Sequence, residues 1–231
     1  MRLLALDTST EACSAALLID GATTLRFAIT ERSHAELILP MVDSLLFEAG
    51  VDLCDLDGLA FGRGPGGFTG LRIATGVIQG LALGANLPVA PVSSLAAVAV
   101  QVPASEGGVV LVCNDARMGE VYWAAFRSDG SGRVEAVTAE SVSPPDHVPL
   151  DIAALRHAAG NGIARYPELR QRLEEAGLQI HDGFYPRADA IARLGARELA
   201  AGRGVAAEMA LPVYVRDDVA RPSGGAVTGM S

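Results

Sequence analysis

The stretch FGRGPGGFTGLRIATGVIQGLALG, from Phe61 to Gly84, constrains this chain more than any other. It joins a short apolar run to a glycine loop and then to an apolar run with helical spacing. Successive glycines indicate positive φ angles or a close approach by another part of the chain. A glycine loop that opens a helix can also bind an anion, because unpaired N–H groups and the helix dipole point at it. The stretch therefore allows two interpretations, a phosphate site or a tight structural connection.

The residues that follow the loop favour the structural connection. A Walker loop needs Lys and Ser or Thr after its last glycine, but Leu71 and Arg72 follow Gly70 and the chain has no Lys. A dinucleotide loop needs an acidic residue at the end of the next strand. The next strand-like run, Pro88 to Val92, ends in two serines instead. Nucleotide chemistry at this loop is the less favoured interpretation.

Four positions still resemble nucleotide-site positions in a degenerate form. Asp7 follows the first predicted strand, and Asp115 follows the first predicted strand of the second half of the chain. Gly64 and Gly66 belong to the glycine loop. An Asp at the mouth of a hairpin can hold a metal-bound phosphate, or it can cap the turn with its own side chain. Turn capping is the favoured interpretation.

Glycine spacing in the predicted helix from Thr69 to Gly84 points to an interface. Gly76, Gly80 and Gly84 fall four apart and share one face. Each costs about 1 kcal/mol relative to Ala in a helix interior, so the face must allow another backbone to approach closely. That backbone belongs either to the same subunit or to a second chain, and we favour the second chain.

A second predicted helix, Ser33 to Ala49, also has an unusually wide apolar face. Ser33 and Glu36 have the spacing of a capping box, and His34 is expected at the surface or as a cap. A wide apolar face is either deeply buried or shared with a partner. The partner-contact residues expected on the two helices are Leu37, Met41, Leu45, Thr69, Ile73, Gly76, Gly80 and Gly84.

Composition excludes several classes of protein. The 231 residues are 50% hydrophobic, and the net charge is −9 with Arg as the only basic residue besides His. A nucleic-acid binder usually has a basic patch or a high pI, so we expect only indirect contact with RNA. Three dispersed cysteines exclude a disulfide framework and fit a reducing cytoplasm. Ile73 to Val100 is uncharged, but Pro88 and Pro91 interrupt it, so we expect no membrane span.

Strand and helix patterns repeat in the two halves of the chain. Each half begins with three successive strands joined by short turns, which predicts an antiparallel meander. We expect one lobe at residues 1–103, a second at 104–216, and a disordered tail at 217–231. The expected strands and helices outside the stretches above are Arg2–Asp7, Ala12–Ile19, Thr23–Thr30, Val109–Asn114, Glu120–Phe126, Val134–Glu140, Tyr166–Ala176 and Arg187–Ala201.

No local catalytic motif is present. The histidines lack the spacing of a metal site, and no serine lies in a G-x-S-x-G sequence. We therefore assign no catalytic residue and no metal ligand. A triad assembled from distant residues is the less favoured alternative. The residues considered were His34, His147, His157, His181, Ser9, Ser14, Ser93 and Ser94.

Several segments together resemble the TsaB (YeaZ) family of tRNA threonylcarbamoyladenosine biosynthesis subunits. They are LALDTSTEACSAALL, SHAELILPMVDSLL, GRGPGGFTGLRIATGVIQGLA, PVAPVSSLAA, DARMGEVYWAAF and PVYVRDDVA. The resemblance implies a two-lobed α/β fold of the actin-like ATPase (ASKHA, ribonuclease H-like) class with mixed sheets. It also implies a paralogue of TsaD, the threonylcarbamoyltransferase, whose metal-binding His-x-x-x-His positions correspond to Ser94 and Val98 here.

The function implied by the resemblance is that of a non-catalytic partner. It would dimerise with a TsaD-type subunit for threonylcarbamoyl transfer to N6 of adenosine 37 in tRNAs reading ANN codons. A homodimer would form in the absence of that subunit, and a TsaE-type ATPase would join the complex. ATP and metal would belong to the partner subunits. The alternatives are an ATP-dependent transferase or kinase using Asp7, the glycine loop and Asp115, and, less favoured, a peptidase.

Overall fold

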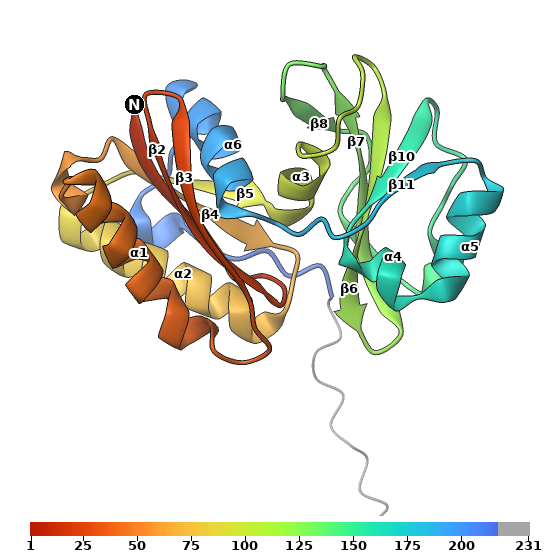
Figure 1. Cartoon of the computed structure of the whole chain (residues 1–231), viewed down its shortest axis with the longest axis horizontal. Coiled ribbons are helices and arrows are strands. Elements are labelled where there is room, and N and C mark those ends of the chain that lie inside the picture. The colour runs from red at the N-terminus through yellow and green to blue at the C-terminus, as the bar shows by residue number, and fades with distance from the viewer. Residues whose placement is uncertain (217–231) are drawn as a thin grey trace, which may run out of the picture.

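The computed structural model describes residues 1–216, so the expected disorder of residues 217–231 lies outside the described residues. Two lobes stand side by side, each built on one β-sheet (Figure 1). The first sheet has the order β3-β2-β1-β4-β5. Its strands are β1 (Arg2–Asp7), β2 (Ala12–Ile19), β3 (Ala22–Ile29), β4 (Gly58–Gly64) and β5 (Val89–Ser93).

The second sheet repeats this arrangement, with the order β11-β10-β6-β7-β8 and β9 paired with β7. In both sheets three successive strands pair antiparallel and come first in the chain. A later strand then pairs parallel to the first of them, and a second later strand pairs parallel to that one. The strands are β6 (Val109–Arg117), β7 (Glu120–Ser128), β8 (Val134–Ala136), β9 (Ser141–Ser143), β10 (Leu155–Ala159) and β11 (Gln179–His181). The duplicated topology confirms the predicted two-lobed, actin-like α/β fold with mixed sheets.

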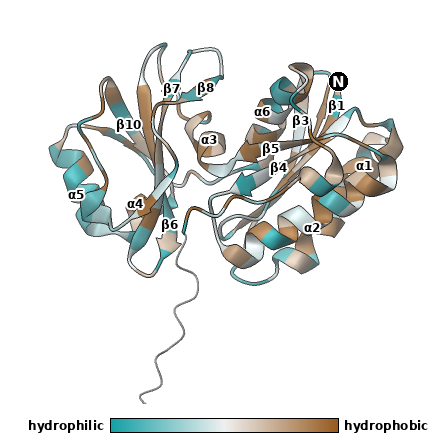
Figure 2. Cartoon of the chain, turned by 180° about the vertical axis from the view of Figure 1, so that it is seen from behind, coloured by the Kyte–Doolittle hydropathy of each residue, from teal (hydrophilic) through white to brown (hydrophobic). Residues whose placement is uncertain are grey.

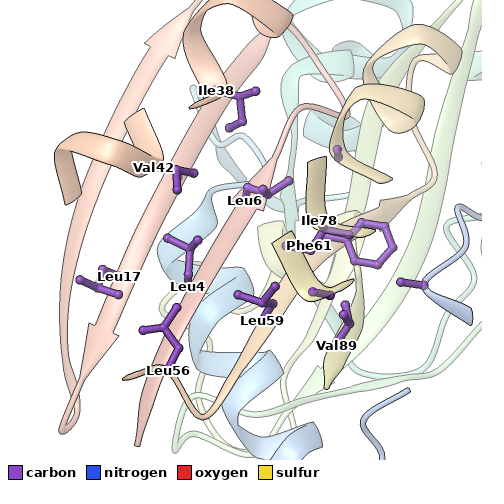
Figure 3. Close-up of a cluster of buried hydrophobic side chains, with 14 of the residues drawn as sticks. Leu4, Leu6, Leu17, Ile38, Val42, Leu56, Leu59, Phe61, Ile78 and Val89 are labelled. Carbon is purple, nitrogen blue, oxygen red and sulfur yellow. The ribbon is translucent and has the colours of Figure 1, made fainter. Parts of the chain in front are cut away.

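Helices cover both faces of the first sheet, which explains the continuous apolar run of β1. Leu4 and Leu6 face α1 (His34–Ala49) and α2 (Phe68–Ala85), within the cluster that Figure 3 shows. Leu3 and Ala5 face α6 (Ala188–Ala200) on the other side. The first sheet is therefore the middle layer of a three-layer lobe.

The position of α6 differs from the lobe boundary expected from sequence. The boundary at residue 104 assigns this helix to the second lobe, whereas α6 packs against the first sheet (Figure 1). A Cβ atom on Gly195 would lie 2.5 Å from the Cβ of Ala60, so the helix backbone sits almost on the strands. Small residues at the centres of β4 and β5, Ala60 and Ala90, make this approach possible.

Helices of the second lobe are short. The expected helix from Tyr166 to Ala176 is confirmed as one helix over Pro167–Glu175, with Tyr166 and Ala176 as its caps, and a separate short helix precedes it. The expected strand Val134–Glu140 is also shorter, and β8 ends at Ala136. The helices of this lobe are α4 (Asn161–Arg165) and α5 (Pro167–Glu175), and α3 (Ser94–Ala99) lies at the junction of the two lobes.

Two expectations about the start of α1 were wrong. Ser33 makes no side-chain cap hydrogen bond, because its backbone has φ −95° and ψ 19° rather than the extended geometry that aims a cap hydroxyl at the first turn. His34 is not at the surface. It is 8% exposed, and its Nε2 lies 2.8 Å from the carbonyl oxygen of Thr10.

The uncharged stretch from Ile73 to Val100 divides as predicted into α2, β5 and α3. Among the described residues, α2 is long and apolar enough to cross a membrane by length and composition alone, a test that core helices of soluble proteins also pass. In this structure α2 buries Leu71, Ala74 and Ile78 in the first lobe.

Candidate functional site

Two features of the described chain are candidates for function, the cleft between the lobes and the outer face of α1 and α2. The cleft holds a cavity of about 440 Å³ at the ends of β1 and β6. Both predicted Asp turns reach this region, the first through Thr8 and Ser9 and the second through Asp115 itself. The cavity is lined by Thr8, Ser9, Thr10, Glu11, Glu31, Arg32, His34, Gly67, Phe68, Thr69, Gly70, Ile73, Asp115, Ala116, Arg117 and Tyr122.

Asp7 is occupied by its own chain. Its Oδ1 accepts hydrogen bonds from the backbone N and the hydroxyl of Ser9, both at 2.8 Å, and its Oδ2 accepts one from Ser94 at 3.1 Å. The side chain is fully buried, and this desolvation raises the pKa of Asp7 to about 6 against the lowering effect of the three hydrogen bonds. The bond from Ser9 N closes a turn, so the predicted turn-capping role of Asp7 is confirmed.

Asp115 occupies the equivalent place in the second lobe and is also held by its own chain. Its Oδ1 accepts hydrogen bonds from the Tyr166 hydroxyl at 2.8 Å and from the backbone N of Arg117 at 2.9 Å. Burial raises the pKa of Tyr166 to about 12, and the hydrogen bond to Asp115 adds to this effect. Both Asp positions therefore cap turns.

The glycine loop is packed against the β1–β2 turn. A Cβ atom on Gly66 would lie 2.4 Å from the carbonyl oxygen of Ser9, and one on Gly70 would lie 1.9 Å from that of Thr8. Gly64 has φ 103°, and a Cβ atom on it would lie 2.9 Å from the carbonyl oxygen of Val213. The loop glycines are required by contacts within the chain, which confirms the predicted structural connection.

Ser94 and Val98, which the sequence resemblance sets against the TsaD histidines, lie in α3 at the junction of the lobes. Both are fully buried, and Ser94 donates its hydrogen bond to Asp7. Neither side chain has the ring nitrogen that binds a transition metal. In residues 1–216 no three His, Cys, Asp or Glu side chains gather as a metal site.

Histidines do not form a nucleophile–base pair within the described ranges. His157 Nδ1 lies 3.2 Å from His181 Nε2, on neighbouring strands of the second sheet. His34 contacts a carbonyl oxygen, and exposed His147 lies near Asp146. No histidine ring bonds to a Ser, Thr or Cys side chain of residues 1–216, so a peptidase triad has no support here.

Polar contacts join the two lobes beside the cleft. Asn161 donates to both carboxylate oxygens of Glu11 at 2.9 Å. Arg63 pairs with Glu140 at 2.9 Å, and Ser93 also donates to Glu140. Glu11, which the sequence analysis did not single out, is therefore a bridge between the lobes. Only the tertiary structure brings it to Asn161.

The glycine stripe lies on the outer face of the first lobe. Gly76, Gly80 and Gly84 are exposed, and a Cβ atom on any of them would have no neighbour within 4 Å. Close packing inside the subunit, one of the two sequence interpretations, is therefore wrong. Thr69 is exposed, and Leu37, Met41 and Ile73 are partly exposed.

Leu45 does not belong to that face. It is 2% exposed and packs in the core beneath α1, so its assignment as a contact residue was wrong. The sequence of α1 is apolar on two sides, and the pattern does not show which side faces the core. Figure 2 shows apolar residues on the outer side of α1 and α2.

Sequence reasoning missed the large apolar side chains that accompany the stripe. Phe47 is 88% exposed and Leu83 is 68% exposed, each near the C-terminal end of its helix. Leu39 is exposed on α1, and Met209 and Leu211 are exposed in and after a short 3-10 helix (Ala207–Met209) that packs against α2. We call the exposed residues of α1, α2 and this 3-10 helix the outer face.

Comparison with known proteins agrees with the fold and with the sequence resemblance. A family model described as TsaD, tRNA N6-adenosine threonylcarbamoyltransferase, matches residues 28–212. The chain is 42% identical over 226 residues to the tRNA threonylcarbamoyladenosine biosynthesis protein TsaB of Escherichia coli (strain K12), covering 95% of this chain and 96% of that protein. The Haemophilus influenzae protein of the same name is 37% identical over 230 residues, with 95% of each chain covered.

A solved structure gives the same result. YeaZ from Pseudomonas aeruginosa superposes with a TM-score of 0.78 at 41% identity, covering 92% of this chain and 99% of that one. The family model and the full-length TsaB relatives therefore establish that the chain belongs to the TsaB (YeaZ) branch of the TsaD family.

Proposed function

We propose that this chain is the non-catalytic partner subunit required for threonylcarbamoyl transfer to N6 of adenosine 37 in tRNAs reading ANN codons. It acts by dimerising with a TsaD-type catalytic subunit through the outer face. One observation carries the proposal: the exposed stripe of Gly76, Gly80 and Gly84, which has no neighbour in its own chain. The names of the TsaB relatives supply the pathway.

The glycine stripe lowers the stability of the isolated helix and allows a partner helix to approach closely. Three glycines weaken α2 by about 1 kcal/mol each relative to Ala, and no contact inside the subunit compensates. Without Cβ atoms, a facing helix can approach closely and gain van der Waals contact along the stripe. Exposed Leu39, Phe47 and Leu83 add the apolar area that typically forms the centre of a stable interface.

The same face supports a homodimer in the absence of the catalytic subunit. A two-fold interface uses the same patch on both copies, so the homodimer and the heterodimer compete for α1 and α2. A TsaE-type ATPase joins the assembled complex rather than this chain alone. A cytoplasmic location fits the free thiols of Cys13, Cys54 and Cys113.

The cleft supports a subunit that does no chemistry by itself. Both Asp carboxylates, which a kinase would use for a metal-bound phosphate, are held by hydrogen bonds within the chain. We therefore propose that ATP and metal bind to the partner subunits. The alternative, an ATP-dependent transferase or kinase, requires Asp7 and Asp115 to release these bonds.

Reconstitution tests the proposal directly. Threonylcarbamoyladenosine formation is measured with the catalytic paralogue, the ATPase and tRNA, with and without this chain, and product should form only when it is present. Full activity without the chain refutes the proposal. Calorimetry of the isolated chain with ATP and Mg²⁺ separates the alternative, because micromolar binding with turnover identifies an enzyme.

A further inference from the structure

A second cavity of about 160 Å³ adjoins the cleft, and its walls carry exposed aromatic side chains. Phe68, at the start of α2, is 44% exposed, and Tyr214 is 42% exposed. Their ring centroids are 5.4 Å apart, and the Arg72 guanidinium lies 3.9 Å from the Phe68 ring centre. Phe68 and Tyr214 therefore place aromatic side chains at one mouth between the lobes, where Arg117 lines both cavities.

Tyr122 gives this mouth a polar floor. It lines both cavities and is only 8% exposed. Its hydroxyl has no hydrogen-bond partner among residues 1–216, whereas the hydroxyl of Tyr166 nearby is bound to Asp115. The hydroxyl is not one of the buried polar atoms that lack a partner, so it reaches solvent at the cavity wall, where an occupant of the mouth can also bond to it.

Formal charge at the mouth is balanced, unlike the net −9 of the whole chain. Arg32, Arg72 and Arg117 have no carboxylate partner in the described part of the chain, while Arg216 pairs with Glu120. Glu11, Glu31 and Asp115 line the main cavity, and the neutral donors that bind Glu11 and Asp115 leave their negative charge in place. Together with Glu120 these carboxylates equal the nearby Arg side chains in number.

Aromatic rings, a free hydroxyl and dispersed guanidinium groups together fit a nucleotide in a single strand. Bases stack on aromatic faces, and Arg neutralises the backbone phosphates. A metal-bound triphosphate fits less well, because the Asp7 and Asp115 carboxylates are already engaged. Building on the proposed function, we propose that this mouth, formed by Phe68, Arg117, Tyr122 and Tyr214, binds an unpaired nucleotide of the substrate tRNA within the assembled complex.

This contact differs from the indirect RNA contact expected from the composition. The net charge of −9 is an average over the whole chain and opposes RNA binding by the chain alone. The mouth joins residues from both lobes, since Val213 N donates to the Arg63 carbonyl oxygen and Arg216 reaches Glu120. A local site of this kind adds to the affinity that the partner subunit provides.

The test measures tRNA binding by the complete complex of this chain with its catalytic partner. Fluorescence anisotropy of labelled tRNA gives the Kd at several salt concentrations for Tyr214→Leu, Arg117→Gln and Tyr122→Phe. Arg127→Gln, at the opposite end of β7 and also exposed, is the control for loss of one positive charge. Photo-crosslinking with 4-thiouridine in the unpaired loop of the tRNA identifies the peptide in contact.

Loss of a stacking partner by Tyr214→Leu should raise the Kd by about fivefold or more. Arg117→Gln should lower the slope of log Kd against log salt by about 0.7, the value for one phosphate contact on a single strand. The crosslinks should map to peptides containing Phe68 or Tyr214, and Arg127→Gln should bind like the wild type.

Unchanged Kd and salt slope in all three variants would overturn the inference. So would loss of assembly in size-exclusion chromatography, because the mouth would then be a protein contact. Failure of the proposed function is seen separately, as full tRNA modification in the absence of this chain. If modification requires this chain but the variants bind tRNA like the wild type, only the proposed RNA contact is refuted.

Discussion

Replacing Asp7 with Asn tests the electrostatics at the centre of the fold. The pKa of this buried carboxyl is raised from 3.8 to about 6, chiefly by desolvation. Between these two pH values the folded state binds more protons at Asp7 than the unfolded state does. The contribution of Asp7 to the free energy of unfolding therefore falls as the pH rises through this window, and stays low above it.

The size of the effect follows from the shift. At about 1.4 kcal/mol per pKa unit, ionised Asp7 costs the folded protein about 3 kcal/mol above pH 6 relative to an unshifted group. The amide that Asp7→Asn introduces does not ionise, and it can still accept from Ser9 N and donate to the Ser94 oxygen. The difference in unfolding free energy, Asp7→Asn minus wild type, should therefore grow by up to about 3 kcal/mol between about pH 4 and pH 7.

Urea unfolding followed by circular dichroism, repeated from about pH 4 to about pH 8, measures this difference. Asp151→Asn, at an exposed position, controls for the removal of one negative charge. A difference for Asp7→Asn that stays constant over the whole pH range would refute the raised pKa. Modification activity in the reconstituted system should change little, since the carboxylate bonds only to Ser9 and Ser94 of its own chain. Complete loss of product with intact assembly would show that the first lobe takes part in the chemistry.

Two further predictions concern the glycines of α2. Gly80→Leu should keep the fold but hold a facing helix away, so association with the catalytic partner should weaken at least tenfold, about 1.4 kcal/mol, in pull-down and size-exclusion experiments. Gln171→Leu on α5 is the matched control. A complex that forms as well with Gly80→Leu as with the wild type would show that the stripe is not in the interface. Gly70→Ala should destabilise by about 3 kcal/mol or more, because its Cβ would lie 1.9 Å from the Thr8 carbonyl oxygen. Gly76→Ala, whose Cβ would have no neighbour within 4 Å, should stabilise the isolated chain by about 1 kcal/mol. Equal shifts in the melting temperature of the two Ala variants would contradict the assignment of Gly70 to a tight contact and of Gly76 to an open face.

The sequence by itself determined the elements and their repetition. Arg2–Asp7 and Ala12–Ile19 were predicted to the residue, because apolar runs bounded by Asp and Gly leave no other regular structure. The glycine loop and the lack of Lys were enough to favour a structural connection over a Walker loop. These features depend on neighbours in the chain, which a sequence records directly.

Only the tertiary structure decided which apolar face is covered and by what. Leu45 and Leu83 are alike in the sequence pattern, yet one is in the core and the other is exposed, since the direction of a helix face depends on the sheet it packs against. The return of α6 to the first lobe, the bond between Glu11 and Asn161, and the meeting of Phe68 with Tyr214 join segments far apart in the chain. Local periodicity carries no information about such contacts, because the path of the whole chain brings them together.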